Sequence, residues 1–82
     1  MYSYVPKGVC SNSINFNIVD NKITEIAFKG GCSGNLTGIS RLVKGMDVLE
    51  AIKRLKGISC GDKSTSCPDQ LALALEEFVE NS

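Results

Sequence analysis

The sequence predicts an α+β fold in which a small antiparallel sheet carries three helices on one face. Two short segments between Ser13 and Lys29 alternate apolar and polar residues, which is the pattern of half-buried strands. A marginal edge strand around Tyr2 and Val5 is expected to precede them. From Leu36 onward, apolar residues recur three and four positions apart, as they do in helices. Since the strands come first, the helices are expected to pack together on one side of the sheet.

The register of the predicted hairpin follows from its apolar residues. A two-residue loop at the Asp-Asn dipeptide would divide those residues between the two faces of the sheet. A three-residue loop, 20–22, instead pairs Phe16 with Ile26 and keeps the apolar set on one face. Carried outward, this register places Cys10 opposite Cys32, with both on the core side.

Two helices are predicted after the hairpin. The first covers 36–43 and is stopped by Gly45. The second begins with a capping box that opens at Asp47, and Gly57 marks its end. Both helices place their apolar residues on one face, which we expect to cover the sheet.

A third helix is predicted at the C-terminal end of the chain. It opens at Ser66 or Cys67, where Pro68 suits the first turn and Asp69 is in position to cap it. Its buried stripe consists of Leu71, Ala74, Leu75, Phe78 and Val79. Leu73 lies off that stripe, which allows a homodimer that buries this second face.

Composition narrows the class of protein. The chain has 82 residues, expected to form a single domain over 1–82, with nine basic and nine acidic residues. This balance argues against nucleic acid or an anionic membrane as the main partner, because both attract a basic surface. A signal peptide and an apolar run long enough for a membrane span are not evident, so a cytoplasmic location is expected. There is no histidine, which excludes a Ser-His or Cys-His couple within the chain.

The candidate functional residues are the four cysteines Cys10, Cys32, Cys60 and Cys67. In a cytoplasmic protein they indicate metal binding or redox chemistry rather than structural disulfides. Cys32 and Cys67 directly precede or open predicted helices, whose N-termini stabilise thiolates. Asp62 and Asp69 are further candidates, as ligands or as acceptors beside the ligands. Three interpretations stay open at this point: a metal site, redox thiols, and cysteines that merely fill the core.

Four segments carry a resemblance to a known family: Gly8-Val9-Cys10-Ser11, Gly30-Gly31-Cys32-Ser33-Gly34-Asn35, Cys60-Gly61 and Thr65-Ser66-Cys67-Pro68-Asp69. Together they closely resemble the TSCPD domain family over nearly the whole chain. That family includes small stand-alone bacterial proteins and a domain near the C-terminus of some ribonucleotide reductase large chains. The resemblance implies an accessory or interaction module that is connected with ribonucleotide reduction. It does not imply reductase activity, because the chain has no room for the barrel, nucleotide pocket and radical site.

A second resemblance concerns the mechanism. Cys10, Cys32 and Cys67 fall where the U-type iron–sulfur cluster scaffold family keeps its three ligand cysteines. The segment Lys44-Gly45-Met46-Asp47-Val48-Leu49-Glu50-Ala51 is similar to the Lys-Gly-x-x-x-x-Glu-Ala segment of that family. This resemblance implies the U-type scaffold fold and a metal site formed by the cysteines.

The chain departs from the U-type pattern at three positions. Asn12 replaces an aspartate, Ser66 replaces a histidine that can precede the last cysteine, and Cys60 is additional. As a fourth ligand, Cys60 would close the site, which suits structural zinc or a stable iron–sulfur cluster better than cluster handover. We therefore expect an accessory module that binds zinc or a cluster through all four cysteines and works with another protein. The alternatives are a dithiol protein, in which Cys60 and Cys67 re-reduce a partner such as ribonucleotide reductase, and a structural interaction domain.

Overall fold

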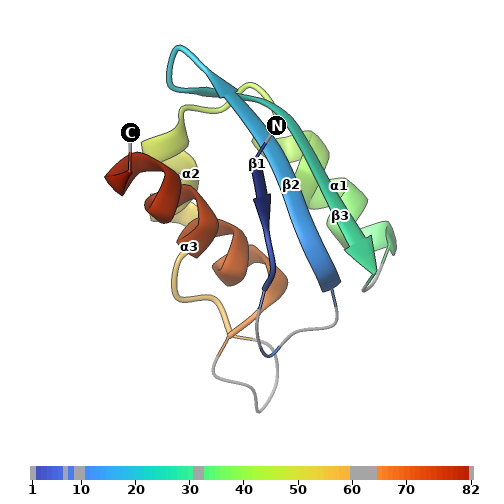
Figure 1. The fold of residues 1–82 in the computed structure, drawn as a ribbon. Coiled ribbons are helices and arrows are strands. Elements are labelled where there is room, and N and C mark those ends of the chain that lie inside the picture. Colours follow the sequence, from blue (N-terminus) through green and yellow to red (C-terminus); the bar gives the residue numbers. More distant parts are fainter. Residues whose placement is uncertain (1, 7, 9–10, 31–32, 60–64, 82) are drawn as a thin grey trace.

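The computed structural model describes residues 2–6, 8, 11–30, 33–59 and 65–81 of the chain. One antiparallel sheet has the strand order β1-β2-β3 and consists of β1 (Tyr2–Tyr4), β2 (Ser11–Val19) and β3 (Lys22–Gly30). The helices are α1 (Ser33–Val43), α2 (Val48–Leu55) and α3 (Cys67–Glu80). Figure 1 shows them on one side of the sheet, with α1 behind β3 and with α2 beside α3. The predicted α+β class is confirmed.

The body of the hairpin has the predicted register. Phe16 pairs with Ile26, and Ile14 pairs with Phe28. As a result, Ile14 and Phe16 are both buried beneath the helices, and their partners on β3 are partly buried against the same core. The predicted pairing of these residues is therefore confirmed, and it keeps the apolar residues of both strands on the buried face.

The turn of the hairpin differs from the prediction. It contains two residues, Asp20 and Asn21, with φ of 52° and 64°, and Lys22 already belongs to β3. The residue that shifts the register is instead Thr24, which forms a bulge beside Asn17 and donates its hydroxyl to the Asn17 carbonyl at 3.2 Å. The predicted three-residue loop is therefore wrong. Asp and Asn tolerate a positive φ better than Lys does, so the extra residue moves out of the turn and into the strand.

A second bulge affects the expected neighbours among the cysteines. At Asn12 the ladder shifts again, and beyond it Ser11 pairs with Gly30. Gly30 has a φ of +79°, and a Cβ added there would lie 3.0 Å from the side-chain nitrogen Nδ2 of Asn12. The pairing of Cys10 with Cys32 was predicted for a ladder without a bulge at Asn12. The observed bulge shifts the ladder by one residue, so that predicted pairing does not follow from the observed register. Both cysteines lie outside the described residues, and their proximity stays a prediction.

The predicted edge strand is present as β1. Tyr2 pairs with Phe16 of β2, and its ring packs edge-on against Phe78 of α3 with centroids 4.6 Å apart. Val5 lies outside the strand and is 69% exposed, so its assignment to β1 was wrong. The ladder with β2 positions the edge strand, and the Tyr2 ring adds a contact with α3.

The connection between α1 and α2 is tied to the start of β3. Gly45 ends α1 with a φ of +88°, as predicted, and its N–H donates to the carbonyl of Ile23 at 2.6 Å. The N–H of Ile23 donates in turn to the carbonyl of Met46 at 3.0 Å. Asp47 then caps α2 by accepting from the N–H of Leu49 at 3.0 Å, which confirms the predicted helix start.

The core lies between the sheet and the helices. Its largest fully buried side chains are Ile14, Ile23, Val48, Leu71 and Leu75. The predicted stripe of α3 is confirmed, although Phe78 and Val79 are only partly buried. Leu73 is half-buried, and Ala72, which the prediction omitted, is fully buried. No helix in the described part of the chain is long and apolar enough to cross a membrane.

Candidate functional site

The first turn of α3 carries the one cysteine that the structure describes. Cys67 is the first residue of α3 and is half-buried, and Pro68 follows it in the first turn. Ser66 is the N-cap: its backbone is extended, and its hydroxyl accepts from the N–H of Asp69 at 3.1 Å. The predicted helix start is confirmed. Because the cap fixes the backbone directly before Cys67, it also fixes the position of Cys67 at the start of the helix.

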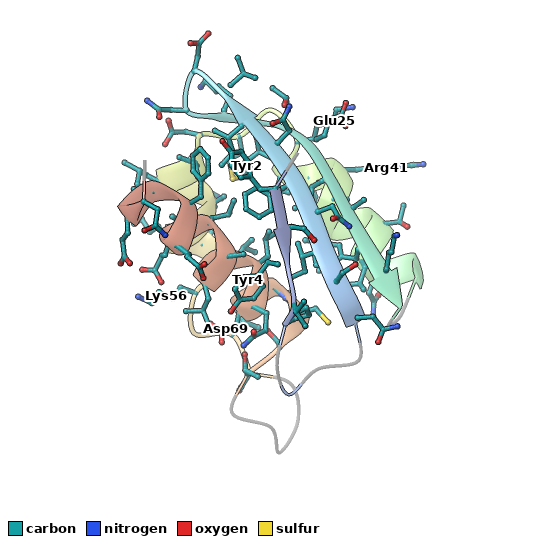
Figure 2. All side chains as sticks on the ribbon, in the orientation of Figure 1. Tyr2, Tyr4, Glu25, Arg41, Lys56 and Asp69 are labelled. Carbon is teal, nitrogen blue, oxygen red and sulfur yellow. The ribbon has the colours of Figure 1, made fainter. Side chains whose placement is uncertain are left out.

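Asp69 does not cap the helix, contrary to the prediction. Its carboxylate accepts from the N–H of Gly57 at 2.7 Å and from the hydroxyl of Thr65 at 2.5 Å. The bond from Thr65, the bond from Gly57 and the charge of Lys56 hold the pKa of Asp69 below its usual value. Figure 2 shows Asp69 and Lys56 where α2 ends and α3 begins. Since both carboxylate oxygens are engaged, the structure favours a structural role for Asp69 over metal ligation.

Further bonds extend this arrangement into what we call the α2–α3 clasp, formed by Gly57, Ile58, Thr65, Ser66, Asp69 and Gln70. The Ser66 hydroxyl donates to the carbonyl of Ile58 at 2.6 Å. The side-chain amide of Gln70 donates to the Thr65 hydroxyl at 2.9 Å. Nearby, the ammonium of Lys56 lies 2.8 Å from a carboxylate oxygen of Glu76, which raises the pKa of Lys56. The clasp therefore joins the chain after α2 to the start of α3.

Chain segments that flank the cysteines meet at this end of the molecule. Gly8, two residues before Cys10, lies against Thr65, because a Cβ added to Gly8 would be 3.4 Å from the Thr65 methyl carbon. Thr65 is itself two residues before Cys67. The flank of Cys10 and the start of α3 are therefore in contact, although they are far apart in the sequence.

The flanks of the other two cysteines reach the same end. The clasp brings the chain two residues before Cys60 to the start of α3. Gly30, two residues before Cys32, pairs with Ser11, which directly follows the first cysteine. Figure 1 shows the start of β2, the end of β3 and the start of α3 at the lower end of the molecule.

Of the four predicted ligands, the structure describes Cys67. Cys10, Cys32 and Cys60 lie outside the described residues, and so does Asp62. Within the described ranges, no group of three or more cysteine, aspartate or glutamate side chains could hold a metal ion. Three of the four predicted ligands lie outside the described ranges, so this result does not test the four-cysteine site, which stays a prediction.

The sequence interpretation missed part of the clasp. The sequence predicts no bonding role for Thr65 or Gln70, yet both belong to the clasp, and Ser66, Asp69 and Gln70 are buried polar residues. Among the described residues, every buried side-chain nitrogen and oxygen has a hydrogen-bond partner. A run of polar residues directly before an apolar helix could have indicated such bonding, because buried polar groups require partners.

Comparison with known proteins identifies one family. A family model described as the TSCPD domain matches residues 2–79, which is nearly the whole chain. No curated protein and no solved structure gives a significant match. The likeness to U-type iron–sulfur scaffolds therefore stays a prediction from the sequence.

Proposed function

Since the chain belongs to the TSCPD domain family, we propose that it is an accessory module that binds one zinc ion or one iron–sulfur cluster. The ligands would be Cys10, Cys32, Cys60 and Cys67. The module would act through a protein partner, for which the family suggests ribonucleotide reductase. The bound metal would hold the end of the domain in a fixed shape that the partner recognises.

The observation that carries this proposal is the convergence of the segments that flank the cysteines. Gly8 lies beside Thr65, Ser11 pairs with Gly30, and the clasp ties the chain before Cys60 to α3. Each predicted ligand lies within two residues of one of these contacts, and two residues of chain reach about 7 Å at most. Four thiol-bearing segments gathered in this way support a shared site.

The available donors suit a thiolate site. The chain has no histidine, and the Asp69 carboxylate at this end already accepts two hydrogen bonds. Four thiolates are a common ligand set for structural zinc and for iron–sulfur clusters. With all four positions occupied by protein, such a zinc site has no open position for a substrate, which favours a structural role over hydrolysis. The metal would contribute folding free energy to a domain with a small core.

A dithiol redox protein is the second candidate, and the clasp is what favours it. Because Ser66 bonds to Ile58, the loop that contains Cys60 is closed at its base, next to Cys67. In this function the two thiols would form a disulfide and lose two protons and two electrons. A disulfide of the partner would accept the two electrons and two protons and become two thiols.

The test compares four variants: Cys10→Ser, Cys32→Ser, Cys60→Ser and Cys67→Ser. If four thiolates hold one metal, each substitution should lower both the metal content and the melting temperature to a similar degree, because metal binding is coupled to folding. A chelator should lower the melting temperature of the wild-type protein. The control is Asp47→Ala, which removes the cap at the start of α2, away from the clasp, and should lower stability by about 1 kcal/mol while leaving the metal content of the folded protein unchanged.

Other patterns would support different functions. A dithiol protein predicts that only Cys60 and Cys67 affect thiol exchange, with no response to the chelator. A three-ligand site of the U type predicts that Cys60→Ser alone keeps the metal. Unchanged stability in all four variants, together with metal-free wild-type protein prepared without oxygen, would refute the proposed metal site.

A further inference from the structure

The outer edge of β3 is open along most of its length. β3 is the last strand of the sheet, so only its inner edge faces β2. At its start, Ile23 exchanges backbone hydrogen bonds with Gly45 and Met46 of the α1–α2 connection. Beyond Ile23, no other described segment pairs with this edge as far as Gly30. An edge of this kind presents backbone N–H and C=O groups to another chain.

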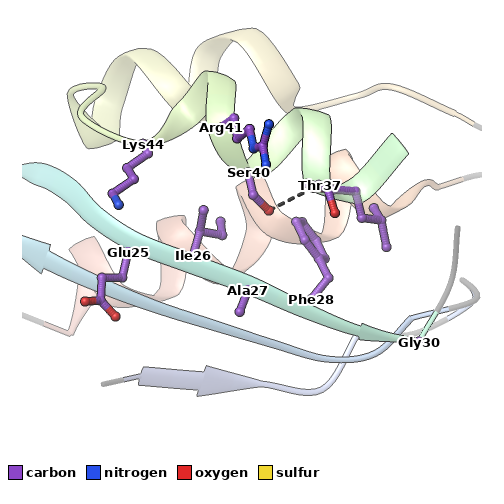
Figure 3. A pocket seen from close by; sticks show the side chains of 10 residues that line it. Glu25, Ile26, Ala27, Phe28, Gly30, Thr37, Ser40, Arg41 and Lys44 are labelled. Carbon is purple, nitrogen blue, oxygen red and sulfur yellow. Dashed lines mark hydrogen bonds between the residues drawn. The ribbon is translucent and has the colours of Figure 1, made fainter. Parts of the chain in front are cut away.

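A groove runs along this open edge, between β3 and α1 (Figure 3). It has a volume of about 550 Å³, and four consecutive strand residues, 25–28, line it. Successive side chains of a strand point to opposite faces. A hollow lined by four consecutive residues therefore follows the edge of the strand rather than one face. Ile26, Phe28 and Leu36 give it an apolar base that continues into the core.

The wall that α1 contributes to this groove is basic. Arg41 and Lys44 both line the groove and are exposed, and neither forms an ion pair with another described residue. Figure 3 shows the Lys44 side chain extending from the end of α1 toward β3. Among the described lining residues, Glu25 is the one carboxylate. Lys29, exposed on the same strand, adds a further cation.

The acidic residues of this neutral chain gather elsewhere. Within α3 there are four carboxylates and no lysine or arginine. The groove and its strand thus carry a local excess of positive charge, from Lys29, Arg41 and Lys44 against Glu25, whereas the charged residues of α3 are all carboxylates. Three further cations lie on α2 or directly after it, at 53, 54 and 56. A ligand with negative charge would meet an attractive field at the groove.

From these observations we propose that the groove binds an extended acidic segment of a partner protein, which joins the sheet as a fourth strand beside β3. The edge from Glu25 to Gly30 is about 17 Å long, enough for about five or six residues. Backbone hydrogen bonds to the open edge would supply affinity, and side chains on the α1 side of the added strand would meet Arg41 and Lys44. The proposal does not depend on metal binding at the cysteines.

Protection against aggregation is the competing explanation for charge at a strand edge. Natural proteins place charged residues on edge strands to prevent pairing with other chains. This explains Glu25 and Lys29 on the strand itself. It does not explain why Arg41 of α1 and Lys44, the residue directly after α1, line the other side of the groove without an ion pair to another described residue.

The first experiment uses the full chain and a fluorescent eight-residue peptide in which valine alternates with glutamate. We expect saturable binding in fluorescence anisotropy, weakened by added salt, and slower amide exchange in β3 residues 25–29. A peptide with lysine in place of glutamate should not bind. Two further acidic peptides carry N-methyl groups on alternate amides, in the two possible registers, and at least one of them should lose binding because it cannot pair with the edge.

The second experiment uses matched charge reversals. Lys44→Glu should weaken binding of the acidic peptide about five- to tenfold, whereas Lys53→Glu, on the exposed side of α2, should change it less than twofold. Equal losses in both variants would overturn the proposal, because they would indicate only general attraction. No binding of the acidic peptide at millimolar concentration, or unchanged binding of both N-methylated peptides, would also overturn it. Self-association that Lys44→Glu abolishes, without peptide binding, would make a second copy of this chain the occupant.

Discussion

At the scale of single residues, the start of α3 is organised by Asp69 and its neighbours. One carboxylate joins three parts of the chain, because it accepts from Gly57 after α2 and from Thr65 before α3 while its own backbone belongs to α3. Ser66 does the same through its hydroxyl, which bonds to Ile58 and to the first turn of α3. These side chains fix the backbone around Cys67, so a site that includes this cysteine would depend on them.

Replacement of Asp69 by alanine should destabilise the protein by about 2–3 kcal/mol, because it leaves the N–H of Gly57 and the hydroxyl of Thr65 without their charged acceptor. Asp47→Ala is the control. It removes a carboxylate that caps α2 from a more exposed position, and it should cost about 1 kcal/mol. Denaturant unfolding measures both, and a smaller loss for Asp69→Ala than for Asp47→Ala would show that the clasp is not stabilising.

The lowered pKa of Asp69 also predicts a dependence on pH. A carboxyl whose pKa is lower in the folded state stabilises the protein fully above its unfolded pKa of about 4. This contribution is lost as the pH falls through the lower folded pKa. The stability difference between the wild type and Asp69→Asn should therefore shrink as the pH falls below about 4, and a constant difference would contradict the assignment.

At the scale of elements, the hairpin shows what the sequence could and could not predict. The pairing of Phe16 with Ile26 was predictable because burial on one face permits only one register. The position of the extra residue was harder to predict, since a longer turn and a bulge in the strand both shift the ladder by one residue. The bulge at Thr24 lets Ile23 and Ile26 share the core face, so the odd spacing of these two isoleucines was the signal in the sequence that the prediction did not use.

The position of the extra residue can be tested by glycine substitution. In the two-residue turn, Asn21 has a φ of 64°, so Asn21→Gly should be neutral or stabilise the protein by up to about 0.5 kcal/mol. Lys22 lies in β3, so Lys22→Gly should destabilise it by about 0.5–1 kcal/mol. The predicted three-residue turn would give the opposite order. Thermal unfolding of the two variants distinguishes them.

At the scale of the whole molecule, the periodicity of apolar residues predicted the strands and helices. The contacts between segments that are distant in the sequence became evident only from the structure. The strand pattern, Gly45 and Asp47 were enough to place the sheet, the end of α1 and the start of α2, whereas α1 begins three residues before its predicted start at Leu36. The polar run before α3 could have indicated bonding there, but the partners in the clasp were not predictable, because Gly57 and Asp69 are 12 residues apart in the sequence. The basic groove was missed for a similar reason, since its strand and its helix wall meet only after folding.

Self-association through α3 also stays a prediction at this scale. The sequence indicated a second apolar face at Leu73, and the structure shows that side chain half-buried within one chain. If a homodimer buries this face, light scattering should give twice the monomer mass at high concentration, and Leu73→Glu should return the protein to a monomer. A monomer throughout the concentration range would remove the prediction.

The measurement that tests the central claim most directly is the metal content of wild-type protein purified without oxygen, combined with its absorption spectrum. The proposed site at Cys10, Cys32, Cys60 and Cys67 predicts one of two results. One is a single zinc ion per chain without visible absorption, and the other is iron and sulfide with the visible absorption of a cluster. A folded, fully reduced protein that contains neither zinc nor iron would contradict the claim.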